Sequence, residues 1–369
     1  MIPYQKIPKG FLAGRLVAQD ILLLPNGEKQ NIGSIAKNVG DIGDVIAVSS
    51  DLKLAVLLAP SLEETKLIDS HHWALQWPKF LQSIRDYFKS EEFNEVNTPT
   101  LVQSSGAETH LDPFTTAFKG KTYYLPTSPE FHLKRLLSSG INKIFEIKTC
   151  FRQDEASITH SPEFTMLEWY RGYAGIDEII KDVKGLLKYV GEQTTTDVVS
   201  MKDLFKRYLD FELSPQITIE ELKTICPESE STDTWSDVFF RIFLEKIEPQ
   251  IGIERPIIVR DFPPTMSALA RINEQGWADR FEVYWRGLEL GNAYDELNDP
   301  VECEKRLKQW NQEKKFLGKA SVPLSKELIS ALRSGMPPSG GIAVGLERLF
   351  MAINNINDIN KTRFFSSEK

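Results

Sequence analysis

Two segments of the sequence place arginines among residues that could bind an anion. The first runs from Cys150 to Tyr170 and carries Arg152 near its start, with Phe164 and Glu168 later. We interpret it as two strands joined by a loop, in which alternation puts Phe164, Glu168 and Tyr170 on one face. A buried arginine beside carboxylates needs a counter-charge, so by itself the segment fits an anion site and a structural ion-pair network equally well.

The second segment is rich in glycine and precedes a predicted helix. Gly340, Gly341 and Gly345 allow the backbone to approach a ligand closely, and Arg348 follows in the early turns of the helix. A guanidinium group matches phosphate oxygens with a forked set of donors. Glycine-rich turns from strand to helix more often reflect tight packing alone, so phosphate binding is indicated by the two segments together.

Several common motifs of nucleotide-binding and hydrolytic enzymes are missing. Gly120-Lys121-Thr122 has Thr115 where a P-loop requires its first glycine. The sequence contains no G-x-G-x-x-G, H-E-x-x-H or G-x-S-x-G pattern either. These observations exclude the common dinucleotide-binding, metalloprotease and serine-hydrolase motifs.

Charge and composition limit the partners of the chain. Its 44 basic and 52 acidic residues give a net charge of −8, which provides no overall attraction for a polyanion. The longest apolar stretches are far shorter than the roughly 20 residues that span a bilayer. The 3 cysteines show no metal-ligand spacing and suit a reducing compartment. We therefore expect a cytoplasmic protein with no membrane partner.

Periodicity predicts the elements that must position these segments. Residues 1–65 read as short strands broken by turns, which predicts a small β-rich N-terminal domain ahead of a catalytic domain over residues 66–369. Helix and strand patterns do not alternate strictly in this second part, so we predict an α+β fold with a mainly antiparallel sheet flanked by helices. The predicted helices cover residues 70–93, 176–190, 301–316 and 326–333, and the predicted strands cover residues 123–125, 144–147, 257–259 and 282–285.

Together these segments resemble the three motifs of class II aminoacyl-tRNA synthetases. Residues 150–170 resemble motif 2, and residues 340–349 resemble motif 3. Residues 95–99 are similar to motif 1, whose proline lies at the dimer interface of that family, and here the proline is Pro99. The resemblance covers residues 70–350 and implies a class II synthetase catalytic domain that activates an amino acid with ATP and Mg²⁺, in a homodimer.

Further segments are similar to the lysine-specific subgroup of this class. They are residues 127–130, 280–284 and 289–292, together with Glu296. Residues 132–137, 162–170 and 334–337 look like one branch of the subgroup, the truncated lysyl-tRNA-synthetase paralogues that attach (R)-β-lysine to a lysine of elongation factor P. The resemblance to this branch implies an AMP-forming ligase.

The resemblance also implies which residues bind ATP and metal. Activation joins a carboxylate to the α-phosphorus, so the site must stabilise charge that spreads over phosphate oxygens. Arg152 is expected at the α-phosphate and Arg348 at the γ-phosphate, both with catalytic roles. Glu282 and Glu289 would hold Mg²⁺, which prefers oxygen ligands, and Phe164 would stack on adenine. The other positions expected to bind ATP are Gln153, Asp154, His160, Ser161, Leu290 and Gly345.

A diamino acid requires carboxylates near both ammonium groups, because an ammonium buried without a counter-charge costs several kcal/mol. By resemblance, Glu168, Tyr170 and Glu296 bind the distal ammonium, and Glu130 with Ser128 lies near the proximal one. Without the resemblance, Glu296 would be interpreted as part of a solvated acidic surface. The remaining substrate positions implied are Pro129, Asn292 and Ala343.

Two features favour (R)-β-lysine and a protein acceptor. Ala343 stands where lysyl-tRNA synthetases usually have glycine, although one methyl group discriminates by only about 1–3 kcal/mol. Residues 1–65 are fewer than an anticodon-binding barrel needs. They contain six basic and seven acidic residues, which provide too little positive charge to bind the phosphates of tRNA well. We therefore expect elongation factor P, and not tRNA, as the acceptor.

Two alternatives stay open. One is a compact lysyl-tRNA synthetase that charges tRNA with L-lysine. The other is a non-catalytic regulatory paralogue. A protein without activity would have no need of both arginines and both carboxylates, so this alternative is disfavoured by the presence of Arg152, Glu282, Glu289 and Arg348.

Overall fold

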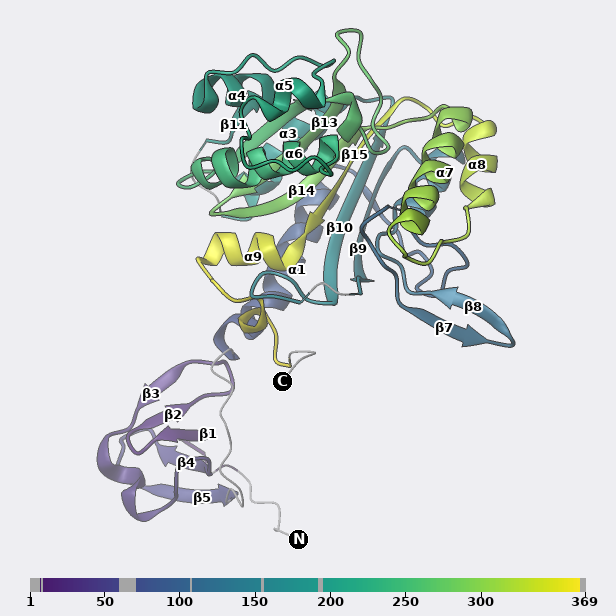
Figure 1. Cartoon of the computed structure of the whole chain (residues 1–369). Coiled ribbons are helices and arrows are strands. Elements are labelled where there is room, and N and C mark those ends of the chain that lie inside the picture. Colours follow the sequence, from purple (N-terminus) through teal and green to yellow (C-terminus); the bar gives the residue numbers. More distant parts are fainter. Residues whose placement is uncertain are drawn as a thin grey trace. The chain divides into compact units, whose positions relative to one another are not determined.

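The computed structural model describes residue 7 and residues 9–59, 71–106, 108–153, 156–191 and 195–365. The chain divides into two compact units, one made of residues 1–81 and 360–369 and the other of residues 82–359 (Figure 1). The predicted domain boundary at residue 65 lies outside the described residues. No helix in the described ranges is both long enough and apolar enough to cross a membrane.

The smaller unit contains an antiparallel sheet with the strand order β3-β2-β1-β4-β5. Leu16, Leu22, Ile46 and Val48 are fully buried and form its core with Ile32. The predicted β-rich N-terminal segment is therefore confirmed. The strands are β1 (Phe11–Ala18), β2 (Ile21–Leu23), β3 (Lys29–Asn31), β4 (Val45–Ser49) and β5 (Ala55–Ala59), with a 3₁₀ turn at Gly33–Asn38.

The larger unit is built on a sheet of eight strands in its described part, in the order β11-β12-β13-β14-β15-β10-β9-β6. The pairs β11–β12 and β6–β9 at its two edges are parallel, and the pairs between them are antiparallel. The predicted α+β fold with a mainly antiparallel sheet is thus confirmed. The strands are β6 (Asn94–Glu95), β9 (Lys143–Phe151), β10 (Glu163–Gly172), β11 (Asp197–Ser200), β12 (Ile257–Phe262), β13 (Ala278–Trp285), β14 (Leu288–Asp295) and β15 (Ser339–Gly345), and a separate hairpin pairs β7 (Thr115–Phe118) with β8 (Lys121–Tyr124).

Capping residues fix where several helices begin. The hydroxyl of Ser200 accepts a hydrogen bond from the Asp203 backbone N–H at the start of α4, and Asp299 caps α7 in the same way. Ser325 caps α8. The helices are α1 (His71–Ser90), α2 (Glu130–Ser138), α3 (Ile176–Tyr189), α4 (Met201–Leu209), α5 (Ile219–Lys223), α6 (Trp235–Ile242), α7 (Pro300–Phe316), α8 (Lys326–Arg333) and α9 (Leu346–Asn354).

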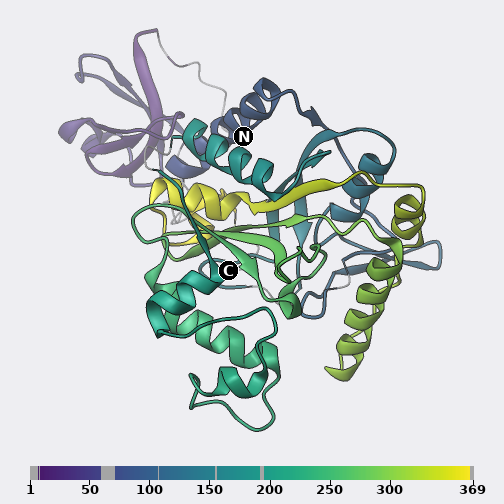
Figure 2. The same cartoon turned by 90° about the horizontal axis from the view of Figure 1, so that it is seen from above.

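The helices gather in separate groups around the sheet. In Figures 1 and 2, α4, α5 and α6 lie near the β11 edge, far from α7 and α8. The first group packs on β12 and β13 through an apolar cluster that includes Phe205, Phe239 and Phe243. The second group, with α2, shares a cluster that includes Leu133, Leu307 and Leu328. The centre of the sheet, between these groups, carries the predicted site.

Candidate active site

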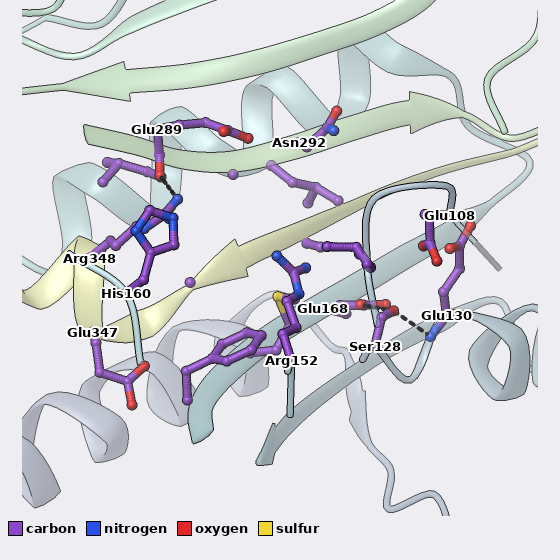
Figure 3. Close-up of a pocket in the computed structure, with 18 of the residues that line it drawn as sticks. Glu108, Ser128, Glu130, Arg152, His160, Glu168, Glu289, Asn292, Glu347 and Arg348 are labelled. Atoms are coloured by element: carbon purple, nitrogen blue, oxygen red, sulfur yellow. Dashed lines mark hydrogen bonds between the residues drawn. The ribbon is translucent and has the colours of Figure 1, made fainter. Parts of the chain in front are cut away.

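Neighbouring strands at the centre of the sheet form the floor of a cavity of about 280 Å³ (Figure 3). Gly341 on β15 lies opposite Tyr170 on β10, and Ala343 lies opposite Glu168. Residues directly opposite one another point to the same face, so these four positions share the cavity side. A side chain at Gly341 would place its Cβ 2.3 Å from the Tyr170 ring, so only glycine leaves this part of the cavity open.

A bulge in β14 aligns residues that regular alternation would separate. Glu282 lies opposite Asn292, so regular pairing would place Tyr284 opposite Leu290. Tyr284 instead lies opposite Glu289, because Leu290 is an extra residue in β14 that has no partner in β13. Glu289 and Asn292 therefore both line the cavity despite their odd spacing. The same shift brings Glu289 to the face of the sheet that carries Glu282.

Arg348 and Arg152 reach the cavity from different elements, Arg348 at one end and Arg152 near the middle (Figure 3). Arg348, in the first turn of α9, donates from Nη1 to the Glu289 carbonyl oxygen at 3.0 Å and from Nε to the Thr159 carbonyl oxygen at 3.3 Å. Its Nη2 also contacts Nε2 of His160. The Arg152 guanidinium lies 5.0 Å from the centroid of the Phe164 ring. Both cationic groups thus face the same space, as Figure 3 shows.

The predicted metal ligands form a carboxylate pair beside these arginines. Glu282 accepts hydrogen bonds from Arg280 and from the hydroxyl of Tyr284, and it does not itself line the cavity. Burial and then the charge of Glu282 raise the pKa of Glu289 to about 7. Such a carboxylate favours a cation nearby. Among the described residues no three His, Cys, Asp or Glu side chains converge on a metal position, so an ion bound here would complete its coordination with phosphate and water, as Mg²⁺ commonly does.

The other end of the cavity is rich in carboxylates. Glu108, Glu130, Glu168 and Glu296 line it in the described part of the chain. Glu168 is fully buried and accepts hydrogen bonds from the hydroxyl of Ser128 at 2.5 Å and from that of Tyr170 at 3.0 Å. Burial and then the charge of Glu130 raise the pKa of Glu168 to about 8.

A buried lysine on α2 neutralises part of this charge. Nζ of Lys134 lies 2.6 Å from Oε1 of Glu130 and 2.7 Å from Oε2 of Glu296. Burial opposes the charge on Lys134, but these two carboxylates outweigh it and raise the pKa of the lysine. Burial raises the pKa of Glu296 to about 8, and Lys134 opposes that rise. Glu130 and Glu296, which were predicted to bind different ammonium groups of a substrate, therefore share one counter-ion.

Most of the predicted site residues come together here. Pro129 and Gln153 do not line the cavity: Pro129 immediately precedes α2, and Gln153 is exposed and forms a β-bridge with Asp112. Asp154 lies outside the described residues. The predicted residues that line the cavity are Ser128, Glu130, Arg152, His160, Ser161, Phe164, Glu168, Tyr170, Glu289, Leu290, Asn292, Glu296, Ala343, Gly345 and Arg348.

Several residues at the site were not predicted from the sequence, among them Glu108, Tyr294 and Glu347 in the lining and Lys134 behind it. Lys134 lies one helical turn after Glu130, a spacing at which an ion pair is expected, so its signal was present. The Glu347 carboxylate accepts hydrogen bonds from the backbone N–H of Thr165 at 3.0 and 2.9 Å and joins α9 to β10. Glu108 belongs to a loop without periodicity, so the sequence alone carried no signal for it.

A mainly antiparallel sheet with two arginines and a carboxylate pair around its central cavity is the arrangement typical of class II synthetases. The chain belongs to the family of class II tRNA synthetases (D, K and N), whose model matches residues 75–369. The resemblance found in the sequence is therefore confirmed.

The chain is also similar to curated proteins named elongation factor P–(R)-β-lysine ligase. It is 35% identical to that of Edwardsiella ictaluri over 311 residues, which cover 80% of this chain and 95% of the relative. It is 36% identical to that of Avibacterium paragallinarum over 301 residues, or 79% and 94% of the two chains. For the Haemophilus influenzae Rd relative the identity is 36% over 303 residues, or 79% and 94%.

Proposed function

We propose that this chain activates (R)-β-lysine with ATP and transfers it to a lysine ε-amine of elongation factor P. The observation that carries the proposal is one cavity with Arg348 at one end, Arg152 near its middle and a cluster of buried carboxylates at the other end (Figure 3). The names and the nearly full-length coverage of the ligase relatives support the particular substrates.

The cationic end fits the phosphates of ATP. Arg348 is held by backbone carbonyl oxygens, which are neutral, so its positive charge stays available to an anion. Arg152 would contact the α-phosphate, where charge grows during the reaction, and the Phe164 ring offers a surface on which adenine can stack. Glu282 and Glu289 would hold Mg²⁺, which when bound neutralises phosphate charge.

The carboxylate-rich end fits a substrate with two ammonium groups. Among the described residues there, Lys134 pairs with two of the four carboxylates, and Arg152 and Lys314 act on Glu108, which still leaves an excess of potential negative charge. A monoamine would neutralise less of this excess than a diamine, because buried charges are costly unless they are paired. The pKa of Glu168 is raised to about 8, so a cation bound beside it would strongly stabilise its charged form.

The reaction consists of two displacements. In the first, an oxygen of the β-lysine carboxylate forms a bond to the α-phosphorus, and pyrophosphate leaves with the electrons of the broken P–O bond. In the second, the acceptor ε-amine attacks the acyl carbon, and AMP leaves. The acceptor amine must lose its proton before it attacks, since a protonated amine is not a nucleophile.

The proposal includes a homodimer in the cytoplasm. The likeness of residues 95–99 to motif 1 supports the dimer, and the three cysteines, all buried and free, suit a reducing compartment. It also includes the division of the chain into a small β-rich domain at residues 1–65 and a catalytic domain at residues 66–369, with elongation factor P in preference to tRNA as the acceptor.

The test offers both acceptors to the protein. The chain is incubated with ATP, Mg²⁺, (R)-β-lysine and elongation factor P, and the intact mass of the factor is measured; a gain of one β-lysyl group that requires ATP is expected. A parallel reaction contains L-lysine and bulk tRNA. Efficient charging of tRNA with L-lysine would favour a compact lysyl-tRNA synthetase, and no product in either reaction would favour a non-catalytic paralogue.

A further inference from the structure

Glu108 and Glu296 each have a buried carboxylate oxygen without a hydrogen-bond partner within the described residues, but that of Glu296 lies 2.7 Å from Nζ of Lys134, whereas that of Glu108 has no such ion-pair contact. The Glu108 oxygen is Oε2, which has almost no accessible surface. Glu130 also contacts Lys134, and Glu168 accepts hydrogen bonds from two hydroxyl groups. An enclosed carboxylate oxygen without a donor is costly, and Glu108 also lines the main cavity, so a carboxylate that turns toward this cavity would gain a donor from a bound ligand.

The surroundings of Glu108 favour a positively charged donor. Figure 3 shows it beside Glu130, at the opposite end of the cavity from Arg348 and His160. Burial and then the charge of Glu130 raise the pKa of Glu108. Arg152 and Lys314 oppose this rise, and an ammonium group placed between the two carboxylates would oppose it further, because it supplies charge and hydrogen-bond donors together.

A glycine in the same loop gives the Glu108 carboxylate its position. A Cβ built on Gly106 would lie 2.2 Å from Oε2 of Glu108 and 2.7 Å from Oγ1 of Thr127. Any larger residue at position 106 would therefore push the carboxylate out of its present place. Because Gly106 has no side chain, the loop leaves room for the Glu108 carboxylate in its present place beside the cavity.

We infer that Glu108 is a specificity-determining residue that accepts a hydrogen bond from one of the two ammonium groups of the diamino acid substrate. The inference rests on the proposed function for the identity of that substrate. The competing explanation is a structural water, because a second cavity of about 10 Å³, close to the size of one water molecule, also touches Glu108, Ser128 and Glu130.

The test compares Glu108→Gln with the wild type on substrates that lack one amine. ATP–pyrophosphate exchange gives the KM of (R)-β-lysine, and inhibition of exchange gives the affinities of 6-aminohexanoate and (R)-3-aminohexanoate, which keep the distal and the proximal amine respectively. We expect the KM of (R)-β-lysine to rise about ten- to a hundredfold. One analogue should weaken similarly and the other should not change, which also identifies the ammonium that Glu108 binds.

Two further variants separate binding from folding. Gly106→Ala keeps the charge but displaces the carboxylate, so it should weaken the same analogue as Glu108→Gln. Glu245→Gln removes an exposed carboxylate outside the cavity lining and should change no affinity. Equal effects of Glu108→Gln on both analogues, or an unchanged KM with a lower melting temperature, would indicate the structural water and overturn the inference.

Direct binding distinguishes a failure of this inference from a failure of the proposed function. Titration calorimetry with (R)-β-lysine and L-lysine measures affinity without any turnover. A wild-type chain that binds neither diamine would overturn both proposals. A wild-type chain that binds or activates (R)-β-lysine while Glu108→Gln behaves identically would overturn only the role of Glu108.

Discussion

The two ends of the cavity hold their charged side chains in opposite ways. At the end with Arg348, the cation is held by carbonyl oxygens, so its charge is not cancelled by the bonds that position it. At the other end, Glu130 and Glu296 are held by Lys134, an ion of opposite charge. The difference shows that the bonds that position Arg348 leave its charge uncancelled, so that only the nearby Glu289 carboxylate offsets it, whereas the second end retains only the negative charge that Lys134 does not cancel.

Removing Lys134 tests this second arrangement and should have the largest effect. In Lys134→Met, Glu130 and Glu296 lose their shared cation, and breaking a buried ion pair in this way costs about 3–5 kcal/mol. The measurement is the free energy of unfolding in urea. The exposed Lys305 provides the matched control, Lys305→Met, which should lie close to the wild type. A loss below about 1 kcal/mol for Lys134→Met would contradict the proposed balance of charge.

Removing Arg348 tests the cationic end. Loss of one donor that stabilises transition-state charge typically lowers kcat about 10²–10³-fold, and we expect a decrease of this size for Arg348→Ala in ATP–pyrophosphate exchange. Arg348→Lys should recover part of the activity because it restores charge without the forked geometry. Arg333→Ala, at an exposed arginine on α8, is the control. Full activity of Arg348→Ala would rule out the phosphate role.

The carboxylate-rich end should make stability depend on pH. The folded chain has Glu168 with a pKa raised to about 8, whereas an unfolded glutamate titrates near 4.3. The folded state therefore binds more protons between these values, so stability should fall as pH rises from about 5 to 8, by at least about 1 kcal/mol. Melting temperatures measured across this range test the sign, and Glu168→Gln should flatten the slope. A melting temperature that rises with pH would refute the assignment.

Ala343→Gly should have the smallest effect. Ala343 lies opposite Glu168 and Asn292 in the sheet, so its methyl group lies on the floor between the carboxylates and the centre of the cavity. Removing it should shift the ratio of kcat/KM values for (R)-β-lysine and L-lysine toward L-lysine by up to about tenfold, since one methyl group discriminates weakly. An unchanged ratio would show that position 343 does not select the substrate.

Long periodic segments of the fold could be predicted from the sequence. The predicted helix at residues 326–333 matches α8, and that at residues 301–316 differs from α7 by one residue. By contrast, α4, α5 and α6 were not predicted, although α4 and α6 are at least as long as α8, and they owe their stability to the shared apolar cluster around Phe239. Such packing depends on contacts that local sequence does not specify.

The site was predictable where a motif or an alternation marked it. Phe164, Glu168 and Tyr170 share a face of β10, as their even spacing predicted. Glu289 and Asn292 share the cavity only because of the bulge at Leu290, which no local pattern in β14 marks. Glu108 reaches the cavity through the path of its loop, and only the folded chain shows this.

ATP–pyrophosphate exchange with (R)-β-lysine, L-lysine and 6-aminohexanoate is the most direct test of the central claim, that one cavity joins ATP to a diamino acid. We expect exchange that requires Mg²⁺ and is fastest with (R)-β-lysine, slower with L-lysine and slowest with the monoamine. Exchange that is equally fast with the monoamine, or no exchange with either diamine, would contradict this claim.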